Sequence, residues 1–166
     1  MIRILMAFFL FAGFIFTGAL HTDGQPPPDP VEMGKKEGFY EGIRSGLEDR
    51  HNFRISRAWQ QVPPSQLSLE NKKEIARPLM KIGLLRQVSL FFPSEEKFNA
   101  YLHAHPEMNA VQAAERILGQ RFVRAYKSSF QKGYEKSLTA SPEKAANYAA
   151  LLKSKKRFEE NNKGNL

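Results

Sequence analysis

Apolar and polar positions divide the chain into one unbroken apolar segment near its start and a longer region with helical spacing. The segment begins at Ile4, ends at Leu20 and carries no charged side chain. Beyond it, apolar residues recur every three to four positions, as on one face of an α-helix, and strand-like alternation is nearly absent. The pattern predicts an all-α protein, a small helical bundle of about four to five helices that follows an N-terminal hydrophobic membrane-targeting helix and a proline-rich linker.

Start signals set the expected helix boundaries. Ser68, Ser94 and Ser141 each stand where an N-cap hydroxyl can accept a hydrogen bond from a first-turn N–H. Pro142 suits a first helical position because proline lacks the N–H that such a position leaves unused. Helices are therefore expected over residues 33–49, 68–92, 94–105, 109–138 and 141–158.

Two regions have a less regular pattern. Residues 53–59 fit a short strand or a continued helix, and the pair Pro63-Pro64 ends that region. Within the expected helix over 68–92, Pro78 marks a kink or a new first turn. Residues 79–91 are apolar on nearly every side, which predicts the central helix of the core.

The apolar segment determines the expected compartment. As a helix its 17 residues span about 25 Å, near the lower limit for crossing a bilayer. Two alternatives remain, a retained anchor or a signal peptide cleaved near Ala19. Arg3 precedes the segment and the next 14 residues after it contain no Lys or Arg, so the rest of the chain is expected to cross the membrane. We expect a single-pass protein of the bacterial inner membrane with its bulk on the periplasmic side, or a periplasmic or secreted protein after cleavage.

The domain organisation follows from these boundaries. Residues 1–20 form the signal-anchor or signal peptide, and residues 21–30 form a proline-rich linker that favours an extended chain. Residues 31–158 form the α-helical domain. Residues 159–166 are polar and rich in asparagine, which predicts a disordered tail.

Glycines recur every fourth residue in the first helix of the domain. Residues four apart lie on one helix face, so these glycines form a stripe without side chains. Each glycine costs about 1 kcal/mol relative to alanine inside a helix, so the stripe must be offset by close packing. The packing partner is another part of this chain or, as a candidate protein interface, a second molecule. The four residues are Gly34, Gly38, Gly42 and Gly46.

Positive charge is concentrated in the last third of the chain. The whole sequence carries a formal charge of +8, and residues 118–166 hold 11 Lys and Arg against 4 Asp and Glu. Such a surface attracts lipid headgroups, acidic proteins or nucleic acid, or serves as a solvated face. The candidate anion-binding residues are Arg121, Arg124, Lys132, Lys136, Lys153, Lys155, Lys156 and Arg157.

An aromatic stripe accompanies these cations. Phe122, Tyr126, Phe130 and Tyr134 recur every fourth residue, which is typical of the buried face of a helix. A base-stacking platform would use the same residue types, but an exported protein rarely meets nucleic acid. We assign the stripe to the core and do not expect nucleic acid as a partner.

Catalytic and metal-binding signatures are missing from the sequence. It has no cysteine and none of the common nucleophile, metalloprotease or phosphate-loop motifs. His103 and His105 are two apart and point to different faces of a helix. We therefore name no catalytic residue, no metal and no cofactor.

These observations favour a non-enzymatic, membrane-tethered helical scaffold or adaptor of a bacterial envelope assembly, such as a secretion or DNA-transfer system. Its partners would be proteins of that assembly and the bilayer that holds residues 4–20. One alternative is a cleaved, exported basic protein that binds anionic surfaces or acidic partners through its C-terminal third. Another is an envelope hydrolase, which two carboxylates about 5–10 Å apart in a pocket would support.

Overall fold

The computed structural model describes residues 28–52 and 67–163, and every regular element in these two ranges is a helix. The predicted all-α class is therefore confirmed for the described residues. The apolar segment over residues 4–20 and the ambiguous stretch over residues 53–59 lie outside them. The helices are α2 (Pro30–Asn52), α4 (Leu69–Ser89), α5 (Glu95–Ala104), α6 (Ala110–Leu118), α7 (Gln120–Leu138) and α8 (Pro142–Lys163).

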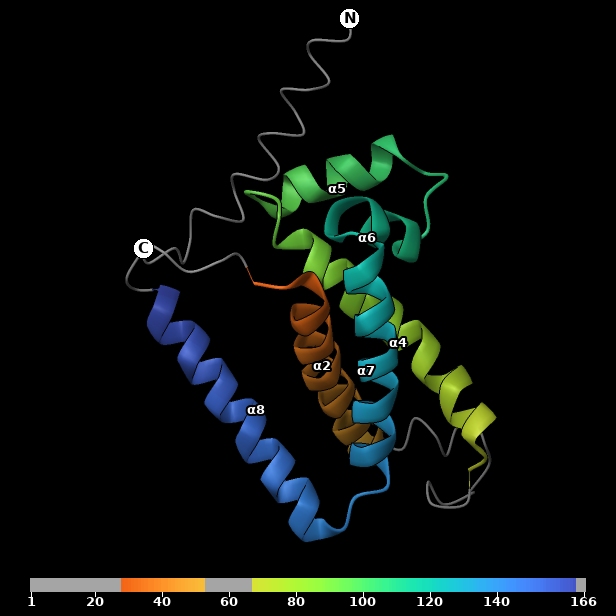
Figure 1. Cartoon of the computed structure of the whole chain (residues 1–166), viewed down its shortest axis with the longest axis vertical. Coiled ribbons are helices and arrows are strands. Elements are labelled where there is room, and N and C mark those ends of the chain that lie inside the picture. The colour runs from red at the N-terminus through yellow and green to blue at the C-terminus, as the bar shows by residue number, and fades with distance from the viewer. Residues whose placement is uncertain (1–27, 53–66, 164–166) are drawn as a thin grey trace, which may run out of the picture.

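The centre of the molecule is the pair α2 and α7, which lie side by side (Figure 1). The aromatic stripe of α7 is buried, as the four-residue spacing predicts. Tyr126 and Tyr134 have no exposed surface, Phe130 is 1% exposed, and their rings stack along the helix. Ile43 of α2 is likewise fully buried. The core thus forms around one face of α7, which α4 and α6 also cover.

Serine and proline start the helices where the sequence predicts. The Ser68 hydroxyl accepts from Asn71 N–H at 3.1 Å, and the Ser94 hydroxyl accepts from Lys97 N–H at 3.3 Å. The Ser141 hydroxyl lies 3.4 Å from the N–H of Lys144, and α8 begins at Pro142. These local signals depend on neighbouring residues alone, so they can be read directly from the sequence.

The expected helix over 109–138 is two helices. α6 ends at Leu118 and α7 begins at Gln120, and between them Gly119 has a φ of 84°. That φ lies in the left-handed region, which breaks an α-helix and which glycine adopts without the strain of a side chain. The apolar spacing continues across the break, so the pattern itself does not reveal it.

The predicted role of α4 needs correction. Gly83, Leu84 and Val88 are buried, but Ile82 is 54% exposed and Leu90 is 71% exposed. α4 packs with one face on α6, α7 and α2, so it covers the core instead of forming its centre. None of the described helices is both long enough and apolar enough to cross a bilayer.

α8 leaves the end of α7 and runs along the outside of α2 (Figure 1). Tyr148, Leu152 and Lys155 face the body of the protein and are partly buried, while most other positions of the helix are exposed. α8 continues to Lys163, so residues 159–163, which the sequence assigns to a disordered tail, are helical.

Two buried phenols on α7 have different surroundings, and they provide a test of the core. The Tyr134 hydroxyl donates to Asp49 Oδ2 at 2.8 Å, and Asp49 is 2% exposed. The Tyr126 hydroxyl reaches the space beside Gly83 of α4, and no hydrogen-bond partner lies within reach among the described residues. Burial raises the pKa of Tyr126, with Glu41 as a second cause, so the phenol stays protonated.

We expect opposite results for the two Tyr→Phe substitutions. Tyr126→Phe removes a buried hydroxyl that lacks a partner, so the free energy of unfolding rises by about 0.5–1.5 kcal/mol. Tyr134→Phe removes a donor to a buried carboxylate, so the free energy of unfolding falls by about 1.5–3 kcal/mol. Urea unfolding of the full chain in mild detergent, followed by circular dichroism, measures both. Equal destabilisation by the two changes would contradict the difference in their surroundings.

Candidate anion-binding site

The outer face of α7 carries the cations that the sequence analysis selects. Phe122, Tyr126 and Phe130 turn one face of the helix into the core, so the positions on the opposite face point outward. Arg124 and Lys132 are exposed on that outer face. The aromatic stripe and the cationic face are therefore two consequences of one helical period.

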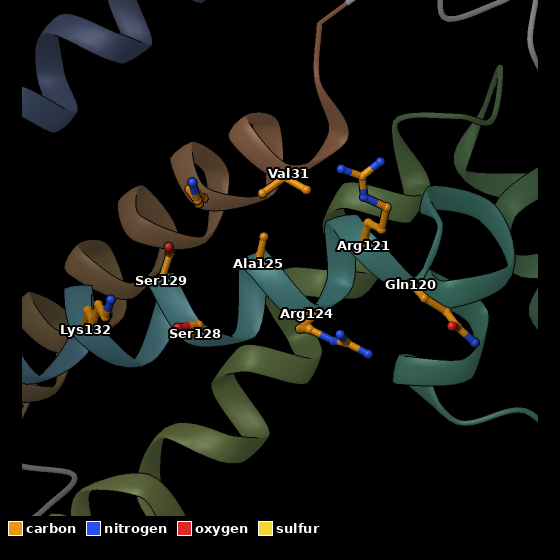
Figure 2. A pocket seen from close by; sticks show the side chains of 9 residues that line it. Val31, Gln120, Arg121, Arg124, Ala125, Ser128, Ser129 and Lys132 are labelled. Carbon is orange, nitrogen blue, oxygen red and sulfur yellow. The ribbon is translucent and has the colours of Figure 1, made fainter.

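A depression of about 420 Å³ lies over the outer side of α7 and the start of α2 (Figure 2). In Figure 2 the Arg121 side chain extends toward the start of α2, and the Arg124 side chain extends away from it. Ala125 and Ser129 point toward α2 between the two helices. We call this depression the cationic hollow; it is lined by Val31, Lys35, Gln120, Arg121, Arg124, Ala125, Ser128, Ser129 and Lys132.

The cationic hollow has an unbalanced charge. Its lining contains four cations and no carboxylate. Lys35 pairs with Glu32 at 2.6 Å on the surface of α2, and the hydrogen bond and charge of Glu32 raise the pKa of Lys35. Arg121, Arg124 and Lys132 make no ion pair with any residue of the described ranges. Three of the four positive charges are therefore free to meet an anion from outside.

A second depression, of about 460 Å³, adjoins the first. Glu115, Gln120, Arg124 and Lys127 line it, so the two depressions share Gln120 and Arg124. The carboxylate of Glu115 makes this neighbour less positive than the cationic hollow. An incoming anion therefore meets the stronger field on the side of α7 that faces α2.

The eight predicted anion-binding residues separate into two groups. Arg121, Arg124 and Lys132 line the cationic hollow, and the other five do not. Lys155 Nζ bonds to Glu37 at 2.6 Å and lies 4.7 Å from the centre of the Tyr40 ring, so it holds α8 to α2. Lys136 Nζ lies 5.9 Å from the centre of the Phe39 ring, and Lys156 pairs with Glu160 at 3.7 Å. The last two residues, Lys153 and Arg157, are exposed.

Sequence reasoning missed Lys35. This residue lies in the part of the chain whose charges nearly balance, so charge counting gave no reason to select it. Its place in the lining of the cationic hollow depends on how α2 packs against α7. Glycine spacing in α2 indicated a close helix contact, but not which helix would make it.

The glycine stripe is occupied by this chain. An added Cβ at Gly34, Gly38 or Gly42 would collide with a backbone carbonyl oxygen of α7, from Phe122, Tyr126 and Phe130 respectively. An added Cβ at Gly46 would meet Ser137 Oγ and would lie 2.6 Å from Tyr134 O. Of the two alternatives that the spacing left open, the structure shows packing within the chain. A candidate protein interface on these four glycines is corrected accordingly, because α7 already fills that face.

No protein family model, curated protein or solved structure matches the chain. Its function must therefore be inferred from its own residues.

One further charged cluster lies inside the described part of the chain. Arg86 Nη1 bonds to Glu41 Oε1 at 2.6 Å, and Arg44 bonds to the same oxygen, which joins α2 to α4. Burial raises the pKa of Glu41, and the nearby Arg44 opposes that change. This carboxylate already has two guanidinium partners, so we assign it to the packing of α4 on α2.

The described residues contain no group of three side chains that could hold a metal ion, and His105 Nδ1 has Glu107 at 3.6 Å as an acidic neighbour. Neither depression is lined by two carboxylates, the arrangement that would support the hydrolase alternative. The chemistry that the cationic hollow can perform is the binding of an anion.

Proposed function

We propose that this chain is a non-enzymatic helical scaffold protein, tethered to the outer face of a bacterial inner membrane, that docks partners with acidic surfaces. Residues 4–20 would be the tether and residues 31–163 the docking body. Because the glycine face is covered by α7, docking is assigned to the cations of α7 and α8. The assembly to which the scaffold belongs, such as a secretion or DNA-transfer system, is part of the same proposal.

The observation that carries the proposal is the set of positive charges without partners on α7. Arg121, Arg124 and Lys132 project from α7, which also carries the three largest fully buried side chains of the described residues. A rigid helix holds the backbone positions of these charges at fixed spacing, so little backbone entropy is lost when a partner binds. A merely solubilising surface would be expected to mix both signs of charge.

The alternative of a cleaved, exported protein uses the same cations. The two versions differ in the fate of residues 1–20, and N-terminal sequencing of the membrane fraction distinguishes them. An intact N-terminus supports the tethered scaffold. A new N-terminus near residue 20, with the protein recovered in the soluble fraction, favours the exported form.

We expect Arg124→Gln combined with Lys132→Gln to weaken docking to an acidic surface. Immobilised polyglutamate is a suitable probe, and the full chain in an uncharged detergent is the sample. Loss of two unpaired cations should lower affinity about thirtyfold at low salt, because each contributes about 1 kcal/mol near an anionic surface. Raising NaCl from about 50 to about 300 mM should lower the affinity of the wild type for polyglutamate by a similar factor.

The matched control removes two cations from another helix. Lys73→Gln combined with Arg77→Gln takes the same charge from exposed positions of α4. This control should keep affinity within about twofold of wild type. Equal losses in the two double variants would show that net charge alone governs binding and would contradict the proposed docking surface. Salt-insensitive binding would contradict it as well.

A further inference from the structure

We infer that the cationic hollow is a binding site for the phosphate-bearing headgroup of an anionic phospholipid. This inference rests on the proposed membrane tether, and it assigns to the hollow a stoichiometric ligand distinct from the acidic surfaces that the scaffold docks. The site is built between two helices, with Lys35 and Val31 from α2 and the remaining residues from α7.

The donors around the hollow suit a phosphate group. Arg121 and Arg124 carry planar guanidinium groups. A single guanidinium group can donate hydrogen bonds to two phosphate oxygens at once. Ser128 and Ser129 add hydroxyl donors, and Gln120 adds an amide. A lipid phosphate has several oxygen acceptors close together, which matches this mixed set better than a single carboxylate does.

The start of α7 adds to the positive field. α7 begins after Gly119, which has no side chain to accept from the first-turn N–H groups. The Asp29, Ser68, Ser94, Asn109 and Ser141 side chains all accept at the starts of the other described helices. The positive end of the α7 dipole therefore lacks a side-chain acceptor, and it lies beside Gln120 and Arg121 at the end of the hollow.

The lining also has an apolar part, and the whole depression is large enough for a lipid headgroup. Val31 and Ala125 contribute carbon surface next to the cations. A bare ion would leave that surface in water, whereas the glycerol carbons next to a lipid phosphate would cover it. The volume of about 420 Å³ lies within the range of small-molecule sites, about 300–1,000 Å³.

The position of the hollow favours a lipid over free phosphate as the source of the ligand. Val31 is the second residue of α2, and nine residues separate α2 from the end of the apolar segment at Leu20. Nine extended residues reach at most about 30 Å. The tether would therefore keep the hollow close to the bilayer surface, where the concentration of headgroups is high.

Native mass spectrometry of the full chain tests this inference. The protein is purified in a maltoside detergent, incubated with short-chain phosphatidylglycerol, and the retained lipids per chain are counted. We expect one retained lipid in the wild type. In the double variant Lys35→Gln with Arg121→Gln the lipid-bound fraction should fall about tenfold, because one cation is lost from each side of the hollow. Both side chains are exposed, and circular dichroism checks that the helices are kept.

A control and two competing ligands make the result decisive. Lys73→Gln with Arg77→Gln removes equal charge from exposed positions of α4 and should leave the bound fraction within about twofold. Equal loss in both variants would overturn the site while leaving scaffold docking to polyglutamate intact. Inorganic phosphate that displaces the lipid at equal concentration would overturn the lipid as the ligand, and so would retention of phosphatidylcholine to the same extent. If polyglutamate binding also fails in the wild type, the proposed function fails with it.

Discussion

Gly42→Ala should lower the free energy of unfolding by about 2–3 kcal/mol, although alanine is the better helix former. An ideal Cβ at Gly42 would meet Phe130 O and lie 2.9 Å from both Phe130 C and Tyr134 N. These are backbone atoms of α7, so they cannot swing aside as the end of a flexible side chain would. In an open helix the same change would stabilise the protein by about 1 kcal/mol, so the sign of the effect reports the contact between α2 and α7.

Urea unfolding of the full chain in mild detergent measures this change in stability. Lys36→Ala, at an exposed position of the same helix, is the control and should stay within about 0.5 kcal/mol of wild type. A stabilising effect of Gly42→Ala, together with unchanged helix content, would show that α7 does not lie against the glycine stripe. The stripe would then again be open to a second molecule.

Phe130→Ala is expected to have the largest effect on stability of any change discussed, a loss of about 3–5 kcal/mol. Phe130 is 1% exposed and sits between Tyr126 and Tyr134, with ring centroids 6.1 and 6.4 Å away. Removing the ring leaves a cavity that the two flanking tyrosines cannot fill, because both are held in the same buried row.

The same substitution on α8 is the matched control. Phe158 is 66% exposed, so Phe158→Ala should change the free energy of unfolding by less than about 0.5 kcal/mol. A difference between the two variants of less than about 1 kcal/mol would contradict the assignment of the α7 aromatic stripe to the core.

Several elements of this fold could be predicted because their causes are local. Ser68, Ser94 and Ser141 cap the helices that follow them through hydrogen bonds to N–H groups three residues ahead. The break at Gly119 was not predicted, because the spacing of apolar residues continues through it and a positive φ is not visible in a pattern of side chains. The exposure of Ile82 on α4 was missed for a related reason, since apolar character alone does not say which side of a helix is covered.

The candidate site could be predicted in part. Arg121, Arg124 and Lys132 could be selected because the aromatic stripe fixes the buried face of α7 and leaves these residues outside. Lys35 could not, because it reaches the hollow through the packing of α2. Lys155 was selected for its charge, yet Glu37 and Tyr40 hold it, and that contact joins residues more than a hundred positions apart.

The sequence by itself determined that the described protein is helical, that α7 has one aromatic and one cationic face, and that α2 must pack closely against something. The helical period, N-capping and the free-energy cost of glycine in a helix all depend on residues close together in the sequence. They can therefore be recognised without knowledge of the tertiary structure. The tertiary structure alone decided that α7 fills the glycine stripe and that this packing places Lys35 in the same hollow as the α7 cations. Which helix faces meet depends on how the whole core packs, and a local pattern does not contain that information.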